Sequence, residues 1–82
     1  MYWVYILQSE RNGRYYVGYC EDVERRLEQH NAAKVKATRY IRPWRVAYRE
    51  EHSTGTEARQ REYYLKSLKS RKVLEELINA GH

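Results

Sequence analysis

A turn sequence, Ser-Glu-Arg-Asn-Gly at residues 9–13, lies between two runs of aromatic and β-branched residues, 2–8 and 14–19. Aromatic and β-branched side chains favour extended strands, and a short connection containing Asn-Gly favours an antiparallel return of the chain. Residues 2–19 therefore predict a β-hairpin. This hairpin requires a fold that contains an antiparallel sheet.

A helix and a third strand are predicted after the hairpin. Asp22 is suited to cap a helix that ends near Asn31, because its side chain can accept a hydrogen bond from the first turn. Residues 32–43 have no regular pattern, and Pro43 prevents a helix just before Trp44. Residues 44–50 alternate as a strand does.

Two further helices are predicted in the C-terminal part. Thr54 and Glu57 have the spacing of a capping box, and Ser70 is suited to cap a last helix that stops at Gly81. The order is therefore β-β-α-β-α-α. This order predicts an α+β fold, a small three-stranded antiparallel sheet flanked by helices.

The size and composition of the chain predict one cytoplasmic domain spanning residues 1–82. Its 82 residues are about the size of one small core, and 41% of them are hydrophobic. No apolar run approaches the roughly 20 residues that cross a bilayer, and the N-terminus lacks the pattern of an export signal, so no membrane association is expected. Cys20 is the single cysteine, which excludes an internal disulfide and suits a reducing compartment.

The charge of the chain favours a polyanionic partner. Sixteen Lys and Arg residues against eleven Asp and Glu give a net charge of +5. Segment 34–49 contains basic residues and no acidic one, with Tyr40, Trp44 and Tyr48 between them. Such a segment can neutralise phosphates and stack on bases, or it can be a solvated loop whose aromatic residues belong to the core. The candidate nucleic-acid contacts are Lys34, Lys36, Arg39, Arg42 and Arg45.

The predicted second strand and first helix contain side chains that could take part in binding or catalysis. Alternation along the strand places Tyr16 and Gly18 on one face, and Tyr15, Val17 and Tyr19 on the other. Arg26 and His30 are four residues apart, so they lie on one face of the helix, about 6 Å from each other. Taken singly, each residue is better explained by packing or by surface charge than by a function.

The combination resembles the GIY-YIG nuclease superfamily, which is named for two tripeptides on adjacent strands. They are represented by Trp3-Val4-Tyr5 and Tyr16-Val17-Gly18, followed by Arg26 and His30 at the family's spacing and by Glu62 on the next helix. Tryptophan replaces the glycine of the first tripeptide. The resemblance covers nearly the whole chain and is closest to small stand-alone bacterial members, which are related to the N-terminal domain of the excision-repair nuclease.

The resemblance implies an endonuclease that hydrolyses phosphodiester bonds in nucleic acid, DNA above all, in repair or processing. It implies one divalent metal, usually magnesium with manganese as a substitute, held by Glu62. Arg26 would grip the scissile phosphate and His30 would assist water activation. Tyr5 and Tyr16 correspond to the family's two tyrosines, one of which would orient the attacking water or take its proton. Proton transfer to a phenol requires a nearby cation that favours its ionised form.

Two other functions remain open at this point. In the first, the protein is a non-catalytic nucleic-acid-binding module that uses segment 34–49, and Glu62 only forms an i,i+4 ion pair with Lys66. In the second, it is a protein-interaction domain whose charge keeps it soluble. Metal-dependent cleavage indicates the enzyme, and salt-sensitive binding without cleavage indicates the module.

Overall fold

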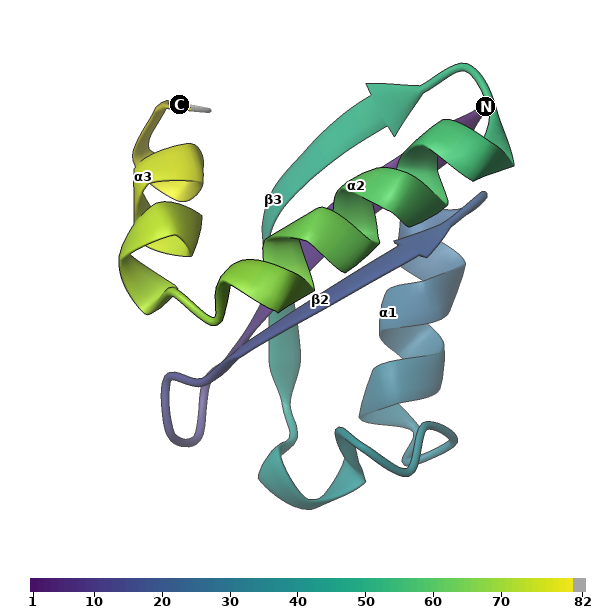
Figure 1. Ribbon diagram of the computed structural model, residues 1–82. Coiled ribbons are helices and arrows are strands. Elements are labelled where there is room, and N and C mark those ends of the chain that lie inside the picture. The colour runs from purple at the N-terminus through teal and green to yellow at the C-terminus, as the bar shows by residue number, and fades with distance from the viewer. Residues whose placement is uncertain (81–82) are drawn as a thin grey trace.

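The computed structural model describes residues 1–80 as a three-stranded sheet with helices on both faces (Figure 1). The predicted element order is confirmed. The elements are β1 (Tyr2–Ser9), β2 (Tyr15–Cys20), α1 (Val23–Asn31), a 3₁₀ helix (Arg39–Ile41), β3 (Trp44–His52), α2 (Gly55–Leu68) and α3 (Arg71–Ala80).

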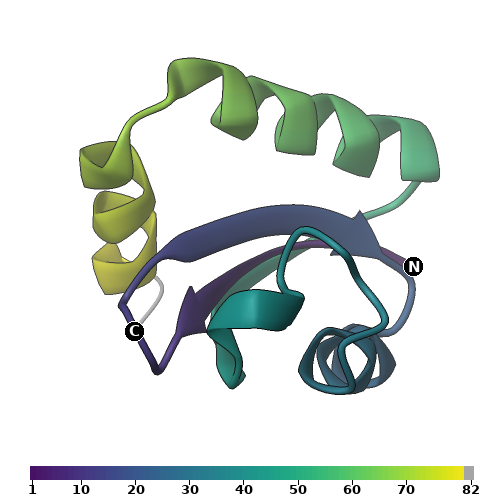
Figure 2. The same cartoon turned by 90° about the horizontal axis from the view of Figure 1, so that it is seen from below.

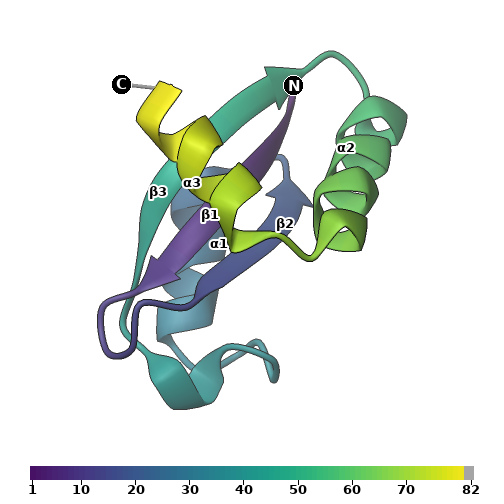
Figure 3. The ribbon, with the colours of Figure 1, turned by 60° about the vertical axis from the view of Figure 1, so that its left-hand side comes forward.

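Two backbone hydrogen bonds within residues 9–14 close the hairpin turn. The Ser9 amide donates to the carbonyl of Arg14 (2.8 Å), and the Gly13 amide donates to the carbonyl of Ser9 (2.9 Å). Gly13 has a φ of +77°, a conformation that glycine adopts without the penalty of a side chain. The strand order is β2-β1-β3, all antiparallel, so β1 is the central strand (Figure 3).

The sheet has a hydrophobic core on each face, as the layers in Figure 2 show. Side chains of β1 alternate between the two cores because successive residues of a strand point to opposite faces. On the face covered by α2 and α3 the buried residues are Val4, Ile6, Val17, Ala58 and Leu65. On the face covered by α1 they are Tyr5, Leu7, Val23 and Trp44.

The third strand departs from the simple alternation that its sequence predicts. Ile6 of β1 pairs with Tyr48, whereas Leu7 pairs with Val46, so Ala47 is an extra residue in the ladder. Because of this bulge, Val46 packs in the core on the α1 side and Tyr48 in the core on the α2 side. On the α1 side, β3 thus contributes Trp44 and Val46 to the hydrophobic core.

The three predicted helix caps are all present. The Asp22 side chain accepts a hydrogen bond from the Arg25 amide (3.1 Å), and the Thr54 hydroxyl accepts one from the Glu57 amide (3.2 Å). The Ser70 hydroxyl accepts from the Val73 amide (3.3 Å). The predicted stop of the last helix at residue 81 lies outside the described residues. Within residues 1–80 the helices are too short and too polar to span a bilayer.

Candidate active site

Tyr5, Tyr16 and His30 meet on the α1 side of the sheet. Tyr5 comes from β1, Tyr16 from the adjacent β2, and His30 from the last turn of α1. The Tyr5 hydroxyl lies 3.1 Å from His30 Nε2, and the Tyr16 ring lies edge-on to the imidazole with their centres 5.0 Å apart. Three of the residues predicted from the sequence are thus in direct contact.

His30 is completely buried and is hydrogen-bonded through both ring nitrogens. Its Nδ1 lies 2.7 Å from Thr38 Oγ1, and the Thr38 hydroxyl donates to the carbonyl of Val35 (3.3 Å). The Thr38 oxygen therefore accepts from His30, which assigns the proton to Nδ1 and leaves Nε2 to accept from the Tyr5 hydroxyl. Burial, aided by the charge of Arg26, lowers the pKa of His30 to about 4, so the ring is neutral at pH 7.

Tyr5 is also buried, with 1% of its surface exposed. Burial raises the pKa of its phenol to about 12, although Arg26 acts in the opposite direction. Because its proton is donated to His30, the Tyr5 oxygen is left as an acceptor on its remaining side. Tyr5 and His30 therefore form a buried, neutral support for the groups at the surface.

Arg26 and Tyr16 are the members of the cluster that solvent reaches. Both side chains are half-buried. The Arg26 guanidinium donates to Gln29 Oε1 (2.8 Å) and influences the pKa of both Tyr5 and His30, so it faces the same site as they do. A guanidinium in this position retains further N–H donors for an anion.

Glu62 reaches the same edge of the sheet from α2. Its side chain is 19% exposed, and its Oε2 lies 3.4 Å from Lys66 Nζ. Lys66 Nζ in turn lies 5.3 Å from the centre of the Tyr16 ring. The i,i+4 ion pair expected for a purely structural Glu62 is therefore formed, and the same lysine connects the carboxylate to the tyrosine cluster.

The carboxylate at residue 62 suits a hard cation that keeps most of its water. Within residues 1–80, no three His, Cys, Asp or Glu side chains are grouped closely enough to hold a metal together. Magnesium in phosphoryl-transfer sites is commonly bound by one or two carboxylates, several waters and substrate oxygens. A single, partly exposed carboxylate, with Lys66 beside it, matches that mode of binding.

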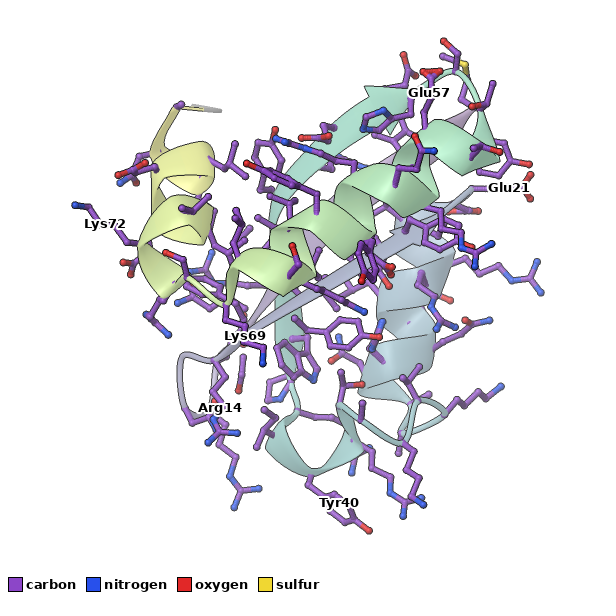
Figure 4. All side chains as sticks on the ribbon, viewed as in Figure 1. Arg14, Glu21, Tyr40, Glu57, Lys69 and Lys72 are labelled. Carbon is purple, nitrogen blue, oxygen red and sulfur yellow. The ribbon has the colours of Figure 1, made fainter. Side chains whose placement is uncertain are left out.

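Segment 34–49 is divided between core and surface. Trp44 is buried and donates its Nε1 to the carbonyl of Thr38 (2.9 Å), whereas Tyr48 is half-buried and donates to Glu50 (2.8 Å). The expectation that all three aromatic residues could stack on bases is therefore wrong for Trp44. Tyr40 is 72% exposed and points away from the rest of the chain in Figure 4.

The basic side chains of this segment form a separate exposed surface. Arg39 is half-buried, stacked on Tyr40 with its Cζ 4.8 Å from the ring centre, while Lys34, Lys36, Arg42 and Arg45 are exposed. Arg49 is not part of this surface, because its Nη1 pairs with Glu24 (2.7 Å) beside Trp3.

Two residues of the site were not predicted from the sequence as functional. Thr38 lies in an irregular stretch, and nothing in its local sequence indicates that it fixes the orientation of His30. The sequence predicts Lys66 only as the i,i+4 partner of Glu62. In the structure its ammonium group also lies over the ring of Tyr16.

Comparison with known proteins agrees with this geometry. The family described as the GIY-YIG catalytic domain matches residues 1–75. A UPF0213 protein of Staphylococcus saprophyticus is 36% identical over 81 residues, covering 98% of this chain and 96% of the relative. A UPF0213 protein of Bacillus licheniformis is 45% identical over 78 residues, covering 94% of this chain and 78% of the relative. The solution NMR structure of a UPF0213 protein from Bacillus halodurans is similar with a TM-score of 0.60 and 36% identity, covering 98% of this chain and 85% of that one.

Proposed function

Because this chain belongs to the GIY-YIG family and has its nuclease fold, we propose that it is an active, divalent-metal-dependent endonuclease. Its substrate would be nucleic acid, DNA in the first place, cleaved during repair or processing in the cytoplasm. The observation that carries the proposal is the meeting of side chains from β1, β2, α1 and α2 at one edge of the sheet.

Each residue of the site has a role that its surroundings support. Arg26 binds the scissile phosphate, because its guanidinium is half-exposed and keeps free donors. Tyr16 is the tyrosine that contacts the attacking water, because solvent reaches it whereas Tyr5 is buried with a raised pKa. Tyr5 and His30 hold Tyr16 and Arg26 in position through their packed, hydrogen-bonded pair.

Glu62 is the residue that would hold magnesium or manganese. Such an ion lowers the pKa of its bound water and neutralises charge on the phosphoryl oxygens. Lys66 balances the charge of Glu62 and lies between it and Tyr16, so it also adds a cation next to the reacting phosphate. Removal of the carboxylate should therefore abolish metal-dependent chemistry and leave the rest of the site intact.

The proposal is tested by Glu62→Gln with Glu76→Gln as the matched control. Glu76 is exposed on α3, and both changes remove one negative charge from a helix while keeping its shape. Labelled duplex, flap, branched and single-stranded DNA, and RNA, are incubated with magnesium and with a chelator. Wild type and Glu76→Gln should cleave only with the metal, and Glu62→Gln should not cleave. Full activity of Glu62→Gln would overturn the role of residue 62.

A non-catalytic nucleic-acid-binding module is the second candidate function. It is favoured by the exposed cations of segment 34–49 and by the ion pair that Lys66 already forms with Glu62. A wild-type protein that binds nucleic acid with strong salt dependence, but cleaves none of the structures tested, would decide for this function.

A further inference from the structure

A groove lies between β2 and the junction of α2 with α3. It has a volume of about 360 Å³ and is bounded by four basic side chains, Arg14, Lys66, Lys69 and Arg71, and by no acidic one. We call this hollow the β2–α2 groove. Apolar parts of Val17, Leu65 and Leu74 form its floor.

Two of the four cations are held in place by the protein itself. The Arg71 guanidinium stacks on Tyr15, 4.4 Å from the ring centre, donates to the carbonyl of Gly13 (3.1 Å) and pairs with Glu75 (3.3 Å). Lys66 is paired with Glu62. Both side chains form walls of the groove but add little to its positive potential, because each already has a carboxylate partner.

Arg14 and Lys69 have no such partner. Both side chains are exposed, and among residues 1–80 neither takes part in an ion pair. Arg14 precedes β2 and Lys69 follows α2, so they approach the groove from two elements, and Figure 4 shows them at the same end of α2. Two unpaired cations over one hollow create a positive potential that suits an anion.

The groove is continuous with the candidate active site. Tyr16 contacts His30 on one side and bounds the groove on the other, and Lys66 lies over the Tyr16 ring while it also bounds the groove. A strand whose phosphate lies at Arg26 can therefore extend past Tyr16 into the groove. α3 begins at the far end, and its first turn contains no acidic side chain that would repel a phosphate.

We propose that the β2–α2 groove binds backbone phosphates of the nucleic-acid strand on one side of the cleaved bond, with Arg14 and Lys69 as the contacts. This inference rests on the proposed function, because it takes the occupant to be the substrate strand. It adds a second binding surface, distinct from segment 34–49 and from the residues that carry the chemistry. The substrate would then run along β2 from Arg26 to Lys69.

The test is the double variant Arg14→Gln, Lys69→Asn. Asparagine suits residue 69 because Lys69 ends α2 with a φ of +47°, a left-handed conformation that asparagine tolerates. The matched control is Arg59→Gln, Lys72→Gln, which removes the same charge from exposed helical positions outside the groove. Lys72 projects to the opposite side of α3 from Lys69 in Figure 4.

Binding of duplex and single-stranded DNA oligonucleotides is measured in chelator over a range of salt concentrations, so that no cleavage is required. Loss of two phosphate contacts should flatten the plot of log affinity against log salt by about 1.5 to 2 units for the groove variant. The control should lose less than half as much. Equal slopes for the two variants would overturn the inference.

A second measurement locates the contact on the strand. A single methylphosphonate, which removes the charge of one phosphate, is placed on either side of the cleavage position or along the bound oligonucleotide. It should weaken wild-type binding at positions on one side, and the groove variant should be insensitive there. If wild type cleaves but the groove variant has the same salt slope as the control, the groove proposal is rejected and the nuclease proposal stands. If the groove variant has a flatter salt slope than the control but wild type cleaves no substrate, the nuclease proposal is rejected and the groove remains a nucleic-acid-binding surface.

Discussion

The Tyr5 ring lies directly against the backbone of Gly18, its partner across the β1–β2 ladder. A β-carbon at residue 18 would lie 2.6 Å from Tyr5 Cζ, which is well inside the normal separation of non-bonded carbon atoms. The tripeptide of β2 thus ends in glycine because the tyrosine of β1 occupies the space that a side chain would need.

We expect Gly18→Ala to lower the free energy of unfolding by about 1 to 3 kcal/mol, as overpacking of a core does. The Tyr5 ring must move away from the new methyl group, and its hydrogen bond to His30 is lost with that movement. Urea denaturation measures the change. In a Tyr5→Leu background the same substitution should be much less destabilising, and an equal loss in both backgrounds would contradict this explanation.

The stability of the protein should fall between pH 6.5 and pH 4 because of His30. Its pKa is lowered from 6.5 to about 4 in the folded protein, so in this window the unfolded chain binds a proton that the folded protein does not. Proton binding by His30 therefore does not change the free energy of unfolding above pH 6.5, and it lowers that free energy progressively as the pH drops to 4. The full effect is about 3 kcal/mol at roughly 1.4 kcal/mol per pH unit.

Denaturation curves at a series of pH values measure this dependence, with His30→Gln as the comparison. The variant should be less stable than wild type at pH 7, because it disrupts the contacts with Tyr5 and Thr38. It should nevertheless lose much less stability between pH 6.5 and 4. An unchanged pH dependence in His30→Gln would assign the effect to another group.

Arg26 and the adjacent Arg25 provide a matched pair for testing the phosphate contact. Both are on α1, but Arg26 faces the tyrosine cluster whereas Arg25 is exposed. Arg26→Ala should lower the cleavage rate by about 100- to 1,000-fold, since it removes a donor aimed at developing charge. Arg25→Ala should change the rate by less than about threefold. Similar rates for the two variants would remove Arg26 from the mechanism.

Segment 34–49 should contribute affinity rather than catalysis. Replacing Arg39, Arg42 and Arg45 together by alanine should weaken DNA binding and flatten its salt dependence by about 2 to 3 units. The rate at saturating DNA should stay near that of wild type. Binding titrations over a range of salt concentrations, followed by single-turnover cleavage, separate the two effects. An unchanged salt dependence would mean that this surface does not contact the nucleic acid.

Local patterns in the sequence predict most of the fold because local groups determine it. The caps at Asp22, Thr54 and Ser70 each satisfy an amide within three residues, so the start of each α-helix can be read without tertiary information. The bulge at Ala47 cannot be read in this way. It is defined by pairing with β1, which is distant in the sequence, and no turn residue marks it.

In the candidate site, too, local spacing could be predicted from the sequence, whereas burial could not. The spacing of Arg26 and His30 predicts that they share a helix face. The structure agrees, because His30 is hydrogen-bonded to Tyr5 and Arg26 opposes the rise that burial causes in the pKa of the Tyr5 phenol. The burial of His30 could not be predicted, because it depends on Thr38 in the following irregular segment, which contacts the imidazole and is itself bound by Trp44 of β3. Burial is decided by the whole chain, and it favours an internal supporting role for His30 over the expected role in water activation.

The central place of β1 has a consequence for how the site moves. Val4, Tyr5, Ile6 and Leu7 are buried between two layers of helices and are paired with strands on both sides. Their amide protons should exchange with deuterium only through global unfolding, because no smaller opening frees a strand held on four sides. Local opening at the ends of β1 should therefore not expose Tyr5 to solvent. A substrate bound as proposed would then meet Tyr16 on a support that stays folded, because the Tyr5–His30 pair behind it is anchored through Tyr5 in the central strand.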